Sequence, residues 1–305
     1  MAGILGAQGV ALLLLARGLE RDARAWRSTW LAPTTNPAKR RTELWFLAYG
    51  GVWIAAFAAI VATEAYERFG AWTYDAVCFG LAAPLYAQPV VAPWLTGESA
   101  TPVWDRFSLK ANAWLVVFGF TGNYWYTQYF YSVLDARYSM PAHRLNNVPI
   151  AMFGATHFYF TFYHALSNAI IRKIRTTYKP SRSRTTFLVV AVGSLCYVTA
   201  FAETLTIAKF PYYSFKDRDL AYTLGSAFYG LYFVVSFPAF YLIDELAPGV
   251  VATKTRDGAY SLARTLVEAL AASMAVLYLL DFARIGVARP LRIEAQATVL
   301  AHTVG

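Results

Sequence analysis

Two histidines and an asparagine lie within a long apolar stretch, residues 148–171. His157, His164 and Asn168 are spaced at i, i+7 and i+11, so an α-helix carries all three on one narrow face. The stretch is long enough to cross a bilayer, where imidazole and amide groups cost several kcal/mol unless they find partners. We therefore expect this face to form an internal site. A hydrogen-bond ladder between helices is the alternative interpretation.

A metal site is not expected on this stretch. Helices of the HExxH type place their two histidines four residues apart, whereas His157 and His164 are seven apart and no carboxylate accompanies them. Cys78 and Cys196 stand singly within apolar segments. They support neither a disulfide framework nor a thiolate metal site.

Glu203 is a carboxyl group within another apolar segment, TAFAETLTIA. Thr199 at i−4 and Thr206 at i+3 share its helical face. One interpretation is a carboxylate that reaches the membrane interface or pairs with a structural base. The other is a buried carboxyl group, which desolvation keeps protonated near neutral pH and which acts as a general acid.

Aromatic and amide side chains gather in FGFTGNYWYTQYFYSVL, which includes Asn123, Tyr124 and Trp125. Aromatic belts at membrane interfaces produce such clusters, and a pocket wall that stabilises a developing cation is the alternative. Tyr212 and Tyr213, in KFPYYSFKDRD, read as an interfacial anchor.

Composition identifies an integral membrane protein. Of the 305 residues, 57% are hydrophobic, 17% aromatic and only 15% charged, which is too apolar for a soluble domain of this length. The formal charge of +9 comes from short basic runs between apolar segments. Membrane topology explains such runs better than nucleic-acid binding does.

The apolar pattern predicts an all-α fold, a polytopic transmembrane bundle of about seven helices. The predicted spans are residues 44–64, 76–95, 111–134, 148–171, 185–208, 221–243 and 260–282. The second contains Pro84, Pro89 and Pro93, so we expect it to be kinked or broken.

Lys and Arg predict the orientation of the bundle. Basic residues cluster at 17–41, before the first span, and at 172–184, after the fourth. An even number of spans between them puts both clusters on the same side. The amino terminus is therefore predicted to be cytoplasmic and the carboxyl terminus to lie on the opposite side.

The chain divides into one membrane domain with two flanking segments. The first residues, MAGILGAQGVALLLLA, resemble the apolar part of a signal peptide but lack its positive start, so we expect residues 1–27 to form an interfacial or loosely ordered extension. Residues 28–290 form the single transmembrane domain, and 291–305 form a tail. The sequence shows no internal repeat.

Several reaction classes lack their motifs in this sequence. There is no Ser-centred nucleophile elbow, P-loop, dinucleotide GxGxxG unit or haem-ligation motif. The candidate chemistry is proton transfer by groups embedded among aromatic side chains in a membrane.

Long segments of the chain resemble a known family. They are STWLAPTTNPAKR, DRFSLKAN, GNYWYTQYFYSVLDARY, RLNNVPIAMFGATHFYFTFYHALSN, AETLTIAKFPYYSFKDRD and FYGLYFVVSFPAFYLIDE. These strings are similar to the signature segments of the cycloeucalenol cycloisomerases, the cyclopropyl sterol isomerases of phytosterol synthesis. They occur in the family's order and cover roughly Ser28 to Asp281.

The resemblance implies a multi-pass membrane enzyme that opens the 9,19-cyclopropane ring of cycloeucalenol to give obtusifoliol. It implies no cofactor and no redox equivalent. The implied partners are the cyclopropyl sterol, the lipid bilayer and, by association, other enzymes of sterol biosynthesis, with no nucleic acid. The compartment is the endoplasmic reticulum membrane in a eukaryote or the inner membrane in a bacterium.

Opening the ring by proton transfer assigns roles to the candidate residues. Glu203 supplies or relays the proton, and His157 or His164 acts as the base or orients the acid, so that the histidine face forms one wall of a dry pocket facing Glu203. The expected lining of the cationic region is Tyr124, Trp125, Tyr212 and Tyr213. The candidates for binding the sterol hydroxyl or fixing the histidine tautomers are Asn123, Asn147 and Asn168.

Two other functions compete with this one. A membrane sterol-binding protein or transporter without catalysis would also carry polar groups in its helices, although a transporter would more naturally show inverted repeats. A double-bond-shifting sterol isomerase of the emopamil-binding type runs related cationic chemistry. Its signature segments are not recognised here.

Overall fold

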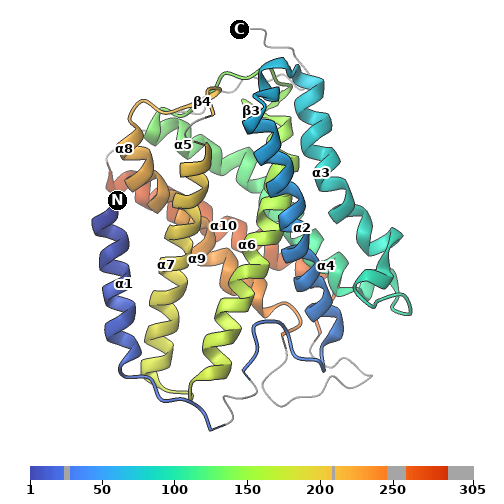
Figure 1. Cartoon of the computed structure of the whole chain (residues 1–305), viewed down its shortest axis with the longest axis vertical. Helices are drawn as coiled ribbons and strands as arrows, with labels where there is room; N and C mark the ends of the chain where they lie inside the picture. Colours follow the sequence, from blue (N-terminus) through green and yellow to red (C-terminus); the bar gives the residue numbers. More distant parts are fainter. Residues whose placement is uncertain (24–27, 208–209, 246–258, 288–305) are drawn as a thin grey trace.

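The structure is a computed structural model, and it describes residues 1–23, 28–207, 210–245 and 259–287. Within this part of the chain, every predicted span forms a helix or a run of consecutive helical segments (Figure 1). The bounds are α2 (Pro37–Ala62), α3 (Ala71–Val91), α4 (Phe107–Thr121) with η5 (Gly122–Tyr126) and α5 (Thr127–Leu134), α6 (Ile150–Thr177), α7 (Arg182–Ile207), α8 (Arg218–Leu220) with η6 (Ala221–Gly225) and α9 (Ser226–Leu242), and α10 (Leu262–Gly286). The predicted all-α bundle is confirmed.

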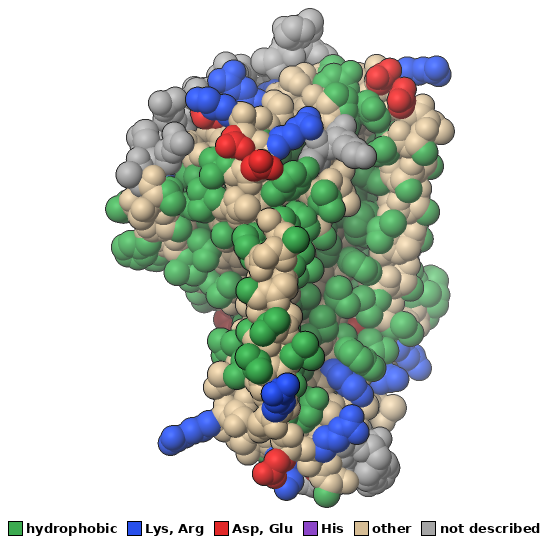
Figure 2. Space-filling view, turned by 60° about the vertical axis from the view of Figure 1, so that its left-hand side comes forward, with side chains coloured by type: hydrophobic (Ala, Val, Ile, Leu, Met, Phe, Trp, Pro, Cys, Tyr) green, Lys and Arg blue, Asp and Glu red, His purple; other side chains and the backbone are tan. Residues whose placement is uncertain are grey.

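Among the described residues, four helical segments are long and apolar enough to cross a membrane: α2, α7, the run 218–242 and α10. Figure 2 shows hydrophobic side chains over the middle of the molecule, with charged side chains gathered towards its two ends. This distribution is that of a multi-pass membrane protein, because charged groups avoid hydrocarbon.

Local signals mark the helix ends. Pro37 begins α2, where a proline loses no backbone hydrogen bond. The side chains of Asp217 and Ser261 cap α8 and α10. In α3, Pro84 and Pro89 lie inside one continuous helix. That helix ends at Val91, two residues before Pro93.

Helix α6 lies at the centre of the bundle and packs against α2, α3, α4, α7 and α9 (Figure 1). Small residues allow its close contacts. A Cβ atom at Gly154 would lie 3.0 Å from the carbonyl carbon of Cys78 on α3, and one at Gly50 on α2 would lie 2.3 Å from the ring of Phe162. Because α6 packs against five helices, its different faces meet different sets of residues.

Short connecting elements complete the described fold. They are η2 (Ala65–Arg68), η3 (Pro93–Leu95), η4 (Val103–Asp105), β1 (Arg137–Tyr138), β2 (Arg144–Leu145), β3 (Val148–Pro149) and β4 (Tyr213–Ser214). Strand β1 pairs antiparallel with β4, and β2 pairs with β3. The pair β1–β4 joins the loop after α5 to the loop after α7.

The two predicted basic regions meet at one end of the bundle. Arg21 forms an isolated β-bridge with Tyr178, and the Ser28 hydroxyl lies 2.7 Å from that of Thr177. The start of α2, the end of α6 and the start of α7 share this end (Figure 1). Both regions thus lie on the same side, as their charge pattern predicts.

Residues 2–16 form helix α1 (Ala2–Ala16), which packs along α7. Gly18 lies beside Ser183 at the start of α7, and the Tyr197 hydroxyl lies 3.8 Å from the sulfur of Met1. The two helices therefore run antiparallel. The predicted tail, 291–305, lies outside the described residues.

Candidate active site

Glu203 lies near the end of α7, where two tyrosine side chains approach its carboxyl group. The Tyr229 hydroxyl on α9 donates a hydrogen bond of 2.8 Å to Oε2 of Glu203, and the Tyr163 side chain on α6 interacts electrostatically with the same carboxyl group. Three helices thus converge on one partly buried acid.

Three further tyrosines interact electrostatically with Glu203: Tyr138 on β1, Tyr159 on α6 and Tyr232 on α9. We call the five residues the tyrosine cluster: Tyr138, Tyr159, Tyr163, Tyr229 and Tyr232. Among the described residues, no Lys, Arg or His forms an ion pair with Glu203. The acid is therefore surrounded by phenol groups and aromatic rings rather than by cations.

Helix periodicity explains why these tyrosines face Glu203. Tyr159 and Tyr163 are four residues apart on α6, and their rings lie nearly parallel with centroids 6.1 Å apart. Tyr229 and Tyr232 are three apart on α9, with centroids 4.8 Å apart. The π-helix η6 directly precedes α9, and such turns change the helical register, often at functional sites.

The paired strands β1 and β4 add a stacked pair of tyrosines to the same region. Tyr138 stacks on Tyr213 with ring centroids 4.3 Å apart. Burial raises the pKa of both phenols, so they remain neutral at physiological pH. Tyr213 therefore contacts the cluster, and its role as a lining residue stays a prediction. Its neighbour Tyr212 packs on Tyr66, with ring centroids 6.2 Å apart.

The histidine face does not form a wall towards Glu203, so that predicted arrangement is wrong. His157 Nε2 lies 2.8 Å from Asn112 Oδ1 on α4. His164 Nδ1 lies 2.8 Å from the Phe160 carbonyl oxygen, and its Nε2 lies 3.0 Å from the Ser236 hydroxyl on α9.

The helical period gives the physical reason. His157 and Tyr159 are two residues apart, which separates them by about 200° around α6. The tyrosine face of α6 meets Glu203, and the histidine face meets α4 and the far part of α9. A catalytic role for either histidine stays a prediction.

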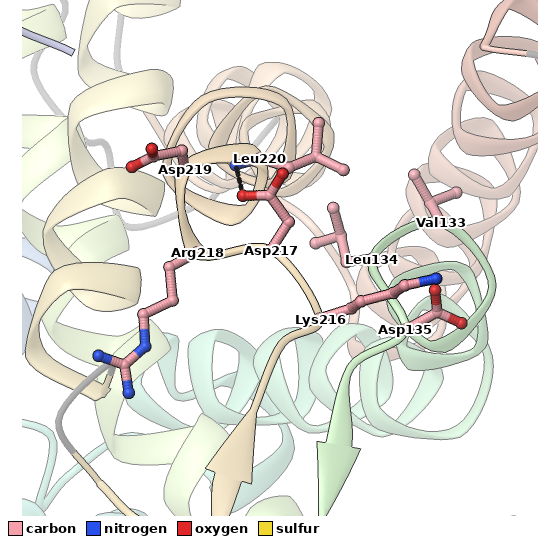
Figure 3. Close-up of a pocket in the computed structure, with 8 residues that line it drawn as sticks. All are labelled: Val133, Leu134, Asp135, Lys216, Asp217, Arg218, Asp219 and Leu220. Atoms are coloured by element: carbon pink, nitrogen blue, oxygen red, sulfur yellow. Dashed lines mark hydrogen bonds between the residues drawn. The ribbon is translucent and has the colours of Figure 1, made fainter.

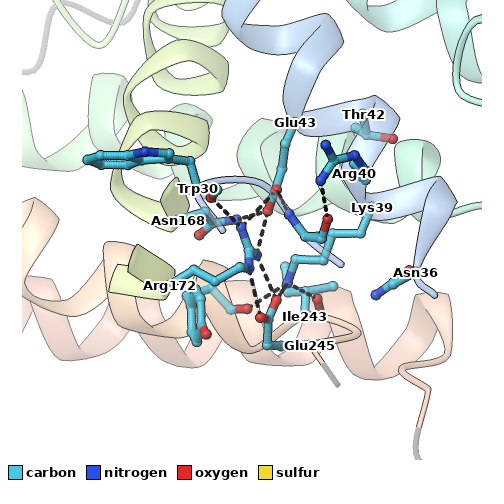
Figure 4. A network of polar contacts seen from close by, with 12 residues as sticks. Trp30, Asn36, Lys39, Arg40, Thr42, Glu43, Asn168, Arg172, Ile243 and Glu245 are labelled. Carbon is cyan, nitrogen blue, oxygen red and sulfur yellow. Dashed lines mark hydrogen bonds and ion pairs between the residues drawn. The ribbon is translucent and has the colours of Figure 1, made fainter. Parts of the chain in front are cut away.

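Asn168 belongs to a different site at the basic end of the bundle (Figure 4). Its amide nitrogen donates to Glu43 Oε1 at 3.1 Å. Arg172, one turn later on α6, binds Glu43 and Glu245 with distances of 2.8 Å each. Lys39 also pairs with Glu245 at 2.8 Å. We call Lys39, Glu43, Arg172 and Glu245 the ionic cluster.

The ionic cluster ties the end of α9 to the start of α2. Lys39 donates to the carbonyl oxygens of Tyr241 and Ile243, at 2.7 and 2.6 Å, and so caps the carboxyl end of α9. Burial tends to raise the pKa of Glu245, but hydrogen bonds from Arg172 and the charge of Lys39 outweigh it and lower this pKa to about 2. These charges are paired and serve the fold.

The remaining predicted residues contact residues other than Glu203. The Asn123 amide donates to the Thr156 hydroxyl at 2.9 Å. Tyr124 and Trp125 pack on each other with ring centroids 5.1 Å apart, and Trp125 is 41% exposed. Asn147 adopts a left-handed conformation, and its carbonyl oxygen accepts from Tyr131 at 3.1 Å. The structure therefore does not group these residues with the acid.

A surface pocket of about 570 Å³ lies next to the β1–β4 pair (Figure 3). Its lining residues are Val133, Leu134, Asp135, Lys216, Asp217, Arg218, Asp219 and Leu220. The charged walls suit water better than an apolar ligand, and Glu203 is not among them. Within the described residues, no group of three His, Cys, Asp or Glu side chains is arranged to hold a metal ion.

Comparison with known proteins places the chain in a family. No family model and no solved structure matches it. A curated protein of Arabidopsis thaliana named Cycloeucalenol cycloisomerase is 40% identical over 263 residues, which cover 85% of this chain and 89% of the relative. The chain belongs to the cycloeucalenol cycloisomerase family. It is thus a membrane isomerase, as its signature segments predict.

All five members of the tyrosine cluster lie in the segments that resemble the cycloeucalenol cycloisomerases, yet the sequence did not single them out. The regular spacing of Tyr159 with Tyr163, and of Tyr229 with Tyr232, was the available signal. Tyrosines are common at membrane interfaces, so this spacing alone did not distinguish a site from a belt.

Proposed function

We propose that this protein opens the 9,19-cyclopropane ring of a cyclosterol within the membrane, converting cycloeucalenol to obtusifoliol. The printed name of the relative supports the reaction. The carboxyl group of Glu203, held by phenols and free of cations among the described residues, supports the site. In this proposal residues 28–290 form the catalytic membrane domain.

The reaction moves one proton in and one proton out. A proton adds to the bridging methylene carbon as its bond to the ring breaks, so that this carbon becomes the angular methyl group. The tertiary cation that results loses a proton from the neighbouring ring carbon to a base, which creates the 8,9 double bond. Atoms and charge balance without an oxidant or reductant.

Glu203 is the proposed source of the proton. A carboxyl group without a nearby cation keeps its proton in a desolvated site, whereas pairing with Arg or Lys would hold it ionised. The faces of the surrounding tyrosine rings stabilise a developing cation, and exclusion of water protects that cation from capture. The single observation that carries the proposal is the contact of Glu203 with neutral tyrosines.

A substrate assay tests the activity. Purified protein in lipid vesicles should convert a cyclopropyl sterol to its 8,9-unsaturated isomer, followed by gas chromatography with mass spectrometry. Conversion of an 8,9-unsaturated sterol alone would favour the double-bond-shifting isomerase. If the protein converts neither sterol, a binding or transport function without catalysis takes precedence.

The same assay in D2O tests the proton source. Protonation by an acid that exchanges with solvent places one deuteron in the new angular methyl group of each product molecule. Unlabelled product would refute this step.

We also propose an orientation and a location. The end of the bundle that carries both basic regions faces the cytoplasm, following the positive-inside rule. The membrane is that of the endoplasmic reticulum in a eukaryote or the inner membrane in a bacterium, where the protein associates with other sterol-biosynthesis enzymes. Protease protection of sealed vesicles tests the orientation.

A further inference from the structure

We propose that Tyr163 and Tyr229 are positioning residues that make Glu203 a strong proton donor, by hydrogen bonding to the carboxylate that remains after the proton leaves. This inference rests on the proposed function of Glu203. It adds two groups that act through the acid rather than on the sterol.

Tyr163 and Tyr229 differ from the other phenols of the cluster in how directly they interact with the Glu203 carboxyl group. Tyr229 donates to Glu203 Oε2 at 2.8 Å, and Tyr163 interacts electrostatically with the same carboxyl group. They approach from different helices, α9 and α6.

Packing fixes both rings before any substrate arrives. The ring of Phe233 lies 6.0 Å from that of Tyr163 and 5.0 Å from that of Tyr229, between centroids. Tyr159 lies parallel to Tyr163 on one side, and Tyr232 lies edge-on to Tyr229. The hydroxyls are therefore preorganised and do not need to reorient during the reaction.

Carbon protonation makes these hydrogen bonds important. A cyclopropane carbon is a weak base, so the acid must give up its proton readily, yet a bare carboxylate in an apolar site is costly. Hydrogen bonds to an ionised acceptor are roughly twice as strong as those to a neutral one. The interactions of both tyrosines with the carboxyl group therefore strengthen as the proton moves from Glu203 to the substrate. They stabilise the transition state more than the ground state, which lowers the barrier.

The groups that face Glu203 within the described residues are phenols. They come from α6, α9 and β1: Tyr138, Tyr159, Tyr163, Tyr229 and Tyr232. No charged side chain among the described residues pairs with Glu203. The pH dependence of the rate should therefore reflect the ionisation of Glu203, as modified by Tyr163 and Tyr229.

Two single substitutions test the proposal, Tyr163→Phe and Tyr229→Phe. Each should lower kcat about 10- to 100-fold, since each removes a hydrogen bond to a charged group, while KM for the sterol changes less than about twofold. The alkaline limb of the pH–rate profile should move up by about one unit, because the carboxylate has lost a stabilising donor.

Tyr49→Phe is the matched control. Tyr49 on α2 is a buried tyrosine whose hydroxyl donates to the Leu81 carbonyl oxygen at 2.7 Å, so the substitution also removes a buried phenol hydrogen bond. It should leave kcat and the pH profile unchanged. Size-exclusion chromatography and thermal melting confirm that each variant is folded.

The outcomes separate this inference from the proposed function. If Glu203→Gln lowers kcat about 10²- to 10⁴-fold but Tyr163→Phe and Tyr229→Phe behave like Tyr49→Phe, the two tyrosines are structural and the inference is wrong. If Glu203→Gln retains turnover, the acid itself is misassigned. In the Glu203→Gln background, either tyrosine substitution should cause no further loss, and an additional 10-fold loss would show a role independent of the carboxylate.

Discussion

Glu43 and Glu203 lie towards opposite ends of the bundle and have different surroundings. Glu43 is 2% exposed and binds the Arg172 guanidinium through both of its oxygens, at 2.9 and 2.8 Å. Glu203 accepts a hydrogen bond from Tyr229 and interacts electrostatically with Tyr163, and no described cation pairs with it. Both acids contact helix α6, so the bundle holds a paired carboxylate and an unpaired one against the same helix.

The comparison separates stability from chemistry. Ion pairs in the ionic cluster neutralise charges that would be costly to bury alone, and they join α2, α6 and the end of α9. A carboxyl group held by neutral donors keeps a proton that it can transfer. Unpaired titratable groups in desolvated surroundings are candidates for function, whereas fully paired groups are candidates for structure.

The largest expected effect is that of Glu203→Gln on turnover. Glutamine preserves the shape and accepts the hydrogen bond of Tyr229 but cannot donate a carboxyl proton, so kcat should fall about 10²- to 10⁴-fold. The melting temperature should stay within a few degrees. A folded variant with near wild-type turnover would end the assignment of Glu203 as the acid.

Arg172→Met should affect stability much more than chemistry. It removes the cation that joins Glu43 and Glu245 and leaves Glu43 uncompensated, which costs about 3–5 kcal/mol of unfolding free energy. Denaturation in detergent measures this loss. A melting temperature equal to that of the wild type would show that the ionic cluster does not stabilise the fold.

Acid should weaken the ionic cluster through Glu245. Its pKa in the folded protein is about 2, against an ordinary value of 4.5, so its contribution is complete above pH 4.5 and disappears as the pH falls towards 2. The loss is on the order of 3 kcal/mol. Melting temperatures recorded across this range should fall less steeply for Glu245→Gln than for the wild type.

His164→Ala tests whether the histidine face belongs to the structural or the chemical region. The imidazole bonds to Ser236 and to the Phe160 carbonyl oxygen, so its removal should cost about 1–3 kcal/mol of stability. Turnover per folded molecule should stay within about threefold. Loss of turnover by a folded variant would instead support the predicted role of His164 as a base or an orienting group.

Lys179→Ala should have the smallest effect. Lys179 pairs with Glu20 at 3.0 Å, but their side chains are 54% and 78% exposed. Exposed pairs contribute less than about 1 kcal/mol, so the melting temperature should hardly change. A loss comparable to that of Arg172→Met would remove the distinction between buried and exposed ion pairs.

The sequence predicted the helices, the basic end and the family. Apolar runs of spanning length cannot leave their backbone groups unpaired in hydrocarbon, so each of them had to form a helix. The prolines of α3 were less informative, because Pro84 and Pro89 are accommodated within one continuous helix. Glu203 stood out for a related reason, as a carboxyl group within an apolar segment.

What the sequence could not determine was the partner of each polar face. Helical spacing showed that His157, His164 and Asn168 share one side of α6, but the same spacing holds whichever helix that side meets. The tertiary packing placed this side against α4, α9 and the ionic cluster, and it turned Tyr159 and Tyr163 towards α7. The spacing and polarity of residues along one helix can be read from that segment alone. The contacts between helices depend on how they pack around the central α6, and this packing is determined by the whole chain.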